Sequence, residues 1–256
     1  IQDDLNKLCE WTINWLMAFN IDKCKILHIG KDNPRFDYDM TDANGQTRKL
    51  KEVTSEKDLG IYIQNDLKFD QHLSHTVNRG NKLVGMIKRA FSFLNEETLL
   101  VLYKTLIRPI MDYGNTVWFP TLKKDIRAVE NVQRRVTRIL PELVDLGYEE
   151  RLRKLKLTTL HYRRNRMDMI QVFKILNNFD DVPSHELFDL STTQTRGHCM
   201  KLNKPRSSKT TRANSFCLRI INSWNNLPEE IVMSRTVLRF KTLYDRYMGD
   251  QKFDLN

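Results

Sequence analysis

The chain has 256 residues, of which 40% are hydrophobic and 29% are charged, values typical of a globular, soluble protein rather than a disordered or collagen-like one. Lysine and arginine total 42 against 32 aspartates and glutamates, so the net charge of +10 is compatible with a nucleic-acid partner without requiring one. No apolar run approaches the ~18 residues of a membrane span, and no signal peptide opens the chain, so no membrane association is expected. Because the sequence begins with Ile1 rather than Met, we expect a fragment of a longer protein.

The first 65 residues are expected to form one helix and a few strands. Apolar residues near helical spacing predict an amphipathic helix over 1–19 that ends at Asn20. Asn44-Gly45 is a strong signal for a hairpin turn. Strands are expected at 24–30, 35–40 and 59–63. Such a unit would leave a sheet edge unpaired and one face uncovered, so we expect it to depend on the rest of the protein for stability.

Beyond Asp66 the pattern becomes helical. Asn95 is expected to cap one helix, and Pro109 is expected to kink or end it. Residues 191–211 are expected to be extended or loop-like. Helices are expected at 72–94, 95–109, 122–140, 158–178, 212–225 and 234–248. The predicted fold class is therefore α+β, with a small N-terminal unit of one helix and a few antiparallel strands followed by a mostly helical remainder.

The segment 122–140 is the most regular amphipathic helix in the sequence. On a helical wheel one arc is apolar and consists of Ile126, Val129, Val132, Val136, Ile139 and Leu140. The opposite arc, called here the cationic arc, consists of Lys123, Lys124, Arg127, Arg134, Arg135 and Arg138. Glu130 is the only acid near it. Cations on one face of a rigid element suit a phosphate backbone, so the cationic arc is a candidate nucleic-acid surface; the alternative is a solvated helix face.

A second basic region lies between Leu190 and Pro228, where the sequence contains no Asp or Glu. Its cations are Arg196, Lys201, Lys204, Arg206, Lys209, Arg212 and Arg219. Serine and threonine are interleaved with them and can also donate hydrogen bonds to phosphate oxygens. The region is a second candidate for binding nucleic acid, and the alternative is a basic loop without a dedicated partner.

The sequence contains no self-contained active site. Asp3-Asp4 invites comparison with the paired carboxylates of two-metal catalysis, but the pair opens a helix, where acids act as caps or dipole partners. His28 lies in an apolar strand and is expected to be structural. No phosphate-binding glycine loop, HExxH motif or GxSxG motif occurs.

The four cysteines are widely separated and form no CxxC pair, which indicates free thiols in a reducing, intracellular compartment. His198, Cys199 and Cys217 were weighed as zinc ligands, but adjacent His-Cys with one distant Cys is not a usual ligand spacing. A structural role is therefore favoured for these residues.

Seven segments occur in an order that matches a known family. They are FNIDKCKILHIG (19–30), EKDLGIYIQNDLKF (56–69), LYKTLIRPIMDYGNTVW (102–118), KKDIRAVENVQRRVTRILPEL (123–143), YEERLRKLKLTTLHYRRNRMDMIQVFKIL (148–176), TRGHCMKL (195–202) and SWNNLPEEIV (223–232). Over essentially the whole chain, this series resembles the C-terminal part of the reverse transcriptase of non-LTR retrotransposons of the jockey kind.

The resemblance implies three regions: 1–67, the end of the palm with the primer-grip hairpin; 68–142, the helical thumb; and 143–256, a basic helical C-terminal region. Lys23 matches the lysine thought to protonate the pyrophosphate leaving group, and Leu59 and Gly60 match the primer grip. The alternatives are that Lys23 is a solvated lysine at a strand edge and that Leu59-Gly60 is an ordinary strand start. The Mg²⁺ implied for the full-length enzyme would be held by an Asp-Asp turn expected just upstream of Ile1.

The function implied by the resemblance is that of a C-terminal fragment of an RNA-directed DNA polymerase. It would bind the backbone of RNA and DNA template-primers, be inactive by itself, and work in the cytoplasm and nucleus. The sequence indicates no protein partner. The alternative is a helical protein-interaction module, or a retrotransposon remnant without function. Salt-sensitive binding to nucleic acid would favour the first reading, and a salt-insensitive protein partner would favour the second.

Overall fold

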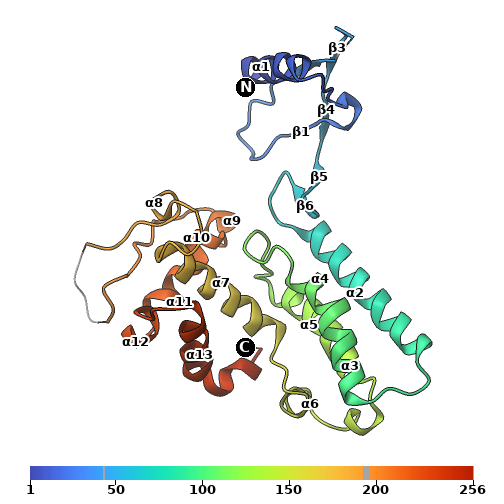
Figure 1. Ribbon diagram of the computed structural model, residues 1–256, viewed down its shortest axis with the longest axis vertical. Coiled ribbons are helices and arrows are strands. Elements are labelled where there is room, and N and C mark those ends of the chain that lie inside the picture. The colour runs from blue at the N-terminus through green and yellow to red at the C-terminus, as the bar shows by residue number, and fades with distance from the viewer. Residues whose placement is uncertain (43, 193–196, 256) are drawn as a thin grey trace. The chain divides into compact units, whose positions relative to one another are not determined.

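The computed structural model describes residues 1–42, 44–192 and 197–255. The chain divides into two units, Ile1–His72 and Leu73–Asn256 (Figure 1). Helix accounts for 54% of the chain and strand for 9%, so the predicted α+β class, a small stranded region followed by helices, is confirmed. No helix among the described residues is both long enough and apolar enough to cross a membrane.

The N-terminal unit opens with α1 (Gln2–Asn14), which is shorter than the predicted helix over 1–19. Trp15 caps its C-terminus, and Leu16 adopts a φ of 54°, a left-handed conformation that stops the helix before Asn20. The apolar spacing continues past this point, but the backbone does not follow it, so the helix end could not be read from periodicity.

The described residues of the N-terminal unit form three two-stranded pairs. The strands are β1 (Lys25–Leu27), β2 (Asp39–Thr41), β3 (Thr47–Lys49), β4 (Lys51–Val53), β5 (Ser55–Asp58) and β6 (Ile61–Gln64). β2–β3 and β5–β6 are antiparallel, as expected, whereas β1 and β4 pair in parallel. Asn44-Gly45 lies in the β2–β3 turn, where Gly45 has a φ of 78°, so this hairpin signal was correct.

The core of the N-terminal unit is small. Its buried apolar residues are Cys9, Ile21, Met40 and Leu50. Three large apolar residues at the end of α1 stay exposed: Trp11 is 48% exposed, Trp15 is 65% exposed and Leu16 is 96% exposed. The unit therefore presents an apolar surface that its own residues do not cover.

The second unit is helical, and its first helix begins just before the boundary. Its α-helices are α2 (Asp70–Ala90), α3 (Glu96–Leu102), α4 (Arg108–Asp112), α5 (Lys123–Thr137), α6 (Tyr148–Lys154), α7 (Leu160–Leu176), α8 (Ser184–Leu187), α9 (Thr210–Ala213), α10 (Phe216–Arg219), α11 (Ile221–Asn225), α12 (Glu229–Val232) and α13 (Val237–Met248). The single helix predicted over 212–225 is wrong, because three short helices occupy this stretch. The last predicted helix is present as α13.

α3 and α4 belong to one helical run that contains a π-helical turn, η2 (Tyr103–Ile107). The side chain of Asn95 accepts a hydrogen bond from the Thr98 backbone N–H at 2.8 Å, so the predicted cap is confirmed. Pro109 does not end the helix, which continues to Asp112. The widened η2 turn precedes the proline and accommodates its missing N–H.

Close packing joins α2, α4 and α5. A Cβ atom added at Gly80 would lie 2.9 Å from Met111 Cε and 3.0 Å from Val132 Cγ1, so a larger residue there would force these side chains to shift. α7 contacts α4, α5 and α13 (Figure 1). The predicted regions 68–142 and 143–256 therefore lie largely in one packed unit. The exception is the segment up to His72, including the start of α2, which lies in the first unit.

Candidate nucleic-acid interface

α5 places the two predicted arcs on opposite sides. Val129, Val132 and Val136 are 2%, 0% and 1% exposed, so the apolar arc faces the interior. Five members of the cationic arc are exposed to solvent: Lys123, Lys124, Arg127, Arg135 and Arg138. The helix therefore carries its positive charges outward, as the wheel predicted, although Arg138 lies at its C-cap rather than within it.

Two arginines of the cationic arc are held by neighbours. The guanidinium of Arg134 is half-buried and lies 4.2 Å from the centre of the Tyr148 ring, which is a cation–π contact. Arg135 Nη1 donates a hydrogen bond to Asn81 Oδ1 of α2 at 3.2 Å. Neither contact involves a carboxylate, so both side chains are ordered without losing their positive charge.

Glu130, the acid that the helical wheel placed near the cationic arc, is turned inward and is 1% exposed. Its carboxylate accepts hydrogen bonds from the backbone N–H groups of Leu160, at 3.0 Å, and His161, at 3.3 Å, in the first turn of α7. The Tyr148 hydroxyl donates a third. A carboxylate is favoured at a helix N-terminus. Burial raises the pKa of Glu130, and these hydrogen bonds and the charge of Arg134 oppose the rise.

Gln133 extends this buried network and is 0% exposed. Its Nε2 donates to the Tyr148 hydroxyl at 2.8 Å and to the Thr158 carbonyl at 2.9 Å, while the Tyr103 hydroxyl donates to its Oε1. These bonds link α5 to η2, to α6 and to the start of α7. The cationic arc is thus mounted on a helix whose other side is fixed by hydrogen bonds as well as by packing.

Arg151 adds a positive charge beside the arc and was not recognised from the sequence. It is 1% exposed, and its guanidinium donates to Thr137 Oγ1 at 3.0 Å and to the Leu146 carbonyl at 2.6 Å. Burial lowers the pKa of Arg151, and the charges of Arg138 and Arg134 lower it further. The three guanidinium groups therefore repel one another, which an anion on the outer face would relieve.

The irregular part of the second basic region is held by α11, which lies in the same region. Trp224 Nε1 donates to the Met200 carbonyl at 2.8 Å, and the Leu202 N–H donates to Asn225 Oδ1 at 2.8 Å. Lys201 is half-buried. The exposed cations of the region are Lys204, Arg206, Lys209 and Arg212. Arg196 lies outside the described residues. The segment is thus irregular beyond Leu202, as predicted, but anchored before it.

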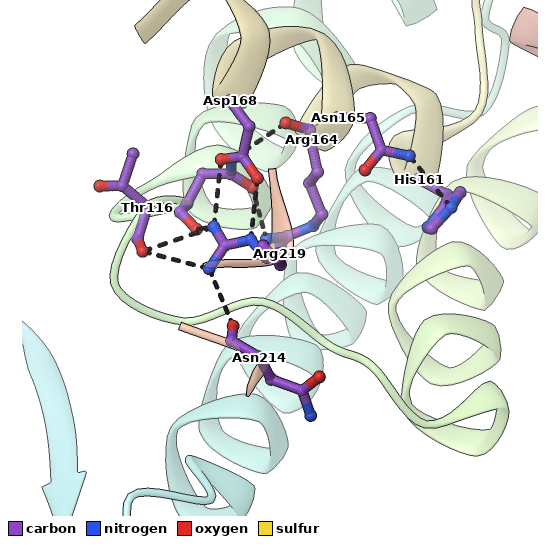
Figure 2. Close-up of polar contacts among 8 residues, drawn as sticks. Thr116, His161, Arg164, Asn165, Asp168, Asn214 and Arg219 are labelled. Carbon is purple, nitrogen blue, oxygen red and sulfur yellow. Dashed lines mark hydrogen bonds and ion pairs between the residues drawn. The ribbon is translucent and has the colours of Figure 1, made fainter. Parts of the chain in front are cut away.

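Arg219, counted above among the cations of this region, is mostly buried, unlike Lys204, Arg206, Lys209 and Arg212. Its Nε and Nη2 bind the two carboxylate oxygens of Asp168 at 2.9 and 3.1 Å (Figure 2). It also donates to the Asn214 carbonyl at 3.3 Å and to the Thr116 carbonyl. Only 11% of its side chain is exposed. A guanidinium so buried requires partners, and it finds them inside the protein.

The same network contains a fully buried arginine on α7. Arg164 is 1% exposed and lies 4.1 Å above the ring of Trp118. It donates to Asn115 Oδ1 at 3.1 Å and to the Met111 carbonyl, and Asn115 donates in turn to Asp168 Oδ1 at 2.7 Å. Burial lowers the pKa of Arg164 to about 10. These residues hold the helices together rather than facing solvent.

In the N-terminal unit, Lys23 is exposed at the end of the 3-10 turn η1 (Ile21–Lys23). Leu59 and Gly60 form the two-residue turn between β5 and β6, with φ angles of 44° and 87°. Positive φ at both positions is the mark of a type I′ hairpin turn. The strand predicted at 59–63 therefore begins only at Ile61, and Leu59, 82% exposed, lies at the hairpin tip.

The residues weighed as metal ligands do not form a metal site. Asp3 and Asp4 are exposed in the first turn of α1, so they do not fit the Mg²⁺ that the resemblance implies. His198 is 2% exposed, and its Nε2 lies 3.1 Å from the Trp224 carbonyl. Within the described ranges, no group of three His, Cys, Asp or Glu side chains could hold a metal ion.

Comparison with known proteins gives one weak match. The chain is 23% identical over 132 residues to an uncharacterized protein of Caenorhabditis elegans, B0403.1. The match covers 50% of this chain and 63% of that protein. No family model and no solved structure matches the chain. The reverse-transcriptase resemblance therefore stays a prediction.

Proposed function

We propose that this chain is the C-terminal part of a non-LTR retrotransposon reverse transcriptase of the jockey kind, and that its helical unit holds the backbone of an RNA–DNA template-primer. The observation that carries the proposal is the cationic arc of α5, which points outward while Glu130, the acid that the helical wheel placed near it, is buried and engaged. A phosphate backbone requires such a surface, with cations in a row and no carboxylate to neutralise them.

The rigid mounting of the arc supports backbone binding rather than base reading. Gln133 and Glu130 fix α5 from behind, so the outer cations keep a constant spacing along the helix. A polymerase must hold any template-primer as it slides, and contacts to phosphates serve every sequence alike. A helix that reads bases would instead depend on particular pairings in a groove.

The proposal includes no independent catalysis by the 256 residues. Phosphoryl transfer by two metal ions needs carboxylates that hold both ions, and Asp3 and Asp4 do not fit that role. Lys23 is proposed to protonate the pyrophosphate leaving group only within a longer enzyme that supplies those carboxylates. Leu59 and Gly60 are proposed as the part of the hairpin that grips the primer. Such a protein would act in the cytoplasm and nucleus.

A second candidate function is a helical protein-interaction module. It is favoured by the uncovered apolar surface at the end of α1, where Trp11 and Trp15 are exposed. Binding of a protein partner through these rings would be insensitive to salt, whereas binding of a phosphate backbone weakens steeply as salt rises.

The test is a salt titration of binding to a primed RNA–DNA duplex. The variant Arg127→Ala/Arg134→Ala/Arg138→Ala should fold and should bind all sequences more weakly. The slope of its log affinity against log salt should be smaller in magnitude by roughly three, because each lost phosphate contact removes about 0.9 from that slope. Val132→Asp should instead unfold the helical unit by burying a charge, which circular dichroism detects.

The matched control is Lys204→Ala/Arg206→Ala/Arg212→Ala, which removes the same number of charges from the second basic region. An unchanged slope and affinity in the folded α5 variant would show that the arc is only a solvated helix face. If the control variant alone lost affinity, the second region would be the interface. Loss of discrimination at one base pair would instead indicate a base-reading helix.

A further inference from the structure

A pocket of about 330 Å³ in the helical unit is lined mainly by positive side chains. Its charged lining consists of Arg108, Lys156, Arg163, Arg166, Lys252 and a single acid, Asp245. These residues come from α4, from the turn after α6, from α7, from α13 and from the 3-10 turn η4 (Gly249–Phe253). The volume lies at the lower end of the roughly 300–1,000 Å³ typical of small-ligand sites.

Two of the five cations already have carboxylate partners. Arg166 Nη2 binds Asp245 Oδ2 at 2.8 Å, and the Tyr162 hydroxyl donates to the other oxygen of Asp245 at 2.6 Å. Arg163 Nη2 binds Asp112 Oδ2 at 2.7 Å. Asp245, the acid in the pocket wall, is therefore hydrogen-bonded by Arg166 and Tyr162, and it acts on Lys252 only through its longer-range charge.

The other three cations, Arg108, Lys156 and Lys252, have no carboxylate within ion-pair distance in the ranges that the structure describes. Arg108 is half-buried. Burial lowers the pKa of Arg108 and the neighbouring charge of Arg163 lowers it further, while the charge of Asp112 opposes the change. Positive charges gathered in a concave, partly desolvated site repel one another and attract an anion.

We propose that this pocket binds a terminal phosphate or diphosphate group. A backbone phosphodiester carries one negative charge and needs one cation, whereas a terminal phosphate carries about −1.5 to −2 at neutral pH. Three cations in excess within one small cavity therefore match a multiply charged terminal group better than a backbone. The proposal uses none of the α5 arc and is independent of the proposed function.

Two sources share this chemistry: a free diphosphate and the 5′-phosphate end of a nucleic-acid strand. The first arm of the test measures the binding of inorganic pyrophosphate to the whole chain by calorimetry, with sulfate at equal ionic strength as a comparison. Lys156→Gln and Lys252→Gln should each weaken pyrophosphate roughly tenfold, the loss typical of one charge-assisted hydrogen bond. Arg108→Gln should do the same, with folding checked by its melting curve.

The second arm uses a short single strand with either a 5′-phosphate or a 5′-hydroxyl. If strand ends are the source, the phosphorylated strand should displace pyrophosphate and the hydroxyl strand should not. If the source is a free diphosphate, pyrophosphate should bind and neither strand should displace it. Both results support the pocket and identify which source it uses.

The matched control is Lys88→Gln/Arg89→Gln, at exposed positions on α2 outside both candidate surfaces, which should leave pyrophosphate affinity unchanged. Equal weakening in this control and in the pocket variants would show a general charge effect and overturn the proposal, as would failure of pyrophosphate to bind at all. Sulfate that binds as tightly as pyrophosphate would also overturn it. If the triple α5 variant keeps pyrophosphate but the wild type never binds duplex, the proposed function fails and the pocket stands.

Discussion

The two units of this chain treat apolar and charged side chains in opposite ways. The N-terminal unit buries few apolar residues and leaves Trp11 and Trp15 in solvent. The helical unit fully buries Trp118 and Trp224, and it also buries charged side chains such as that of Arg164. Small units have little interior relative to their surface, so only the larger one can bury charges with all their partners.

The two units also differ in the source of their stability. In the helical unit, buried polar networks connect helices that are far apart in sequence, as Asp168 of α7 does with Arg219 of α10. In the N-terminal unit, the strands pair two by two and the apolar end of α1 is uncovered. We therefore expect the helical unit to be stable by itself and the N-terminal unit to need further protein that covers its apolar surface.

The strongest test of this difference is to separate the units. A fragment of residues 70–256, which keeps α2 intact, should melt cooperatively, because it retains every contact of the large core. A fragment of residues 1–72 should show no cooperative transition or should associate through its exposed tryptophans. Calorimetry and analytical ultracentrifugation measure both properties. A monomeric 1–72 fragment with a sharp melting transition would contradict the comparison.

A substitution with a smaller effect is Asp168→Asn, which preserves the shape of the side chain and removes its charge. The buried guanidinium of Arg219 would then lose its carboxylate partner, and Arg164, which is linked to Asp168 through Asn115, would lose a nearby negative charge. Breaking a buried pair in this way costs about 3–5 kcal/mol, which chemical denaturation of the helical unit should detect.

The control is Glu230→Gln in the same unit, where the carboxylate lies 3.8 Å from Arg239 Nη2 at the surface. This change should cost less than about 1 kcal/mol, because ion pairs near solvent contribute little. Equal costs for the two variants would mean that the Asp168 network is no more important than a surface pair.

Local signals in the sequence predicted much of the fold correctly. The periodicity of 122–140, the cap at Asn95 and the turn at Asn44-Gly45 each act within a few residues, and each is found in the structure. The parallel pairing of β1 with β4 and the division of 212–225 into three helices were missed, because both depend on residues distant in sequence.

The candidate site, too, could be predicted only where the signal was local in the sequence. The wheel placed the cationic arc correctly, but it could not show that Arg219 would turn inward, because its partner Asp168 lies 51 positions away in the sequence. Gln133 offered a missed signal: it is a polar residue within the apolar arc, and it marks the buried network with Tyr148. The cations of the phosphate pocket are also scattered along the chain, and only the fold brings Arg108 near Lys252.

The smallest effect expected is a dependence on pH that belongs to the helical unit. His161 lies in the first turn of α7, with its Nε2 3.1 Å from Asn165 Nδ2 (Figure 2). Its ring is edge-on to that of Phe119. Its Nδ1 is buried without a hydrogen-bond partner among the described residues. Burial lowers the pKa of His161, and the charge of Arg164 lowers it further.

Because this pKa is lower in the folded than in the unfolded state, the unfolded chain takes up a proton first as pH falls below about 6.5, the usual histidine value. The helical unit should therefore lose stability between pH 7.5 and 5.5, by at most about 1.4 kcal/mol per pH unit for this one proton. His161→Gln should flatten the slope of unfolding free energy against pH, whereas His185→Gln, at an exposed position on α8, should leave it unchanged. A slope that is the same in the wild type and in both variants would show that the buried ring does not couple folding to pH.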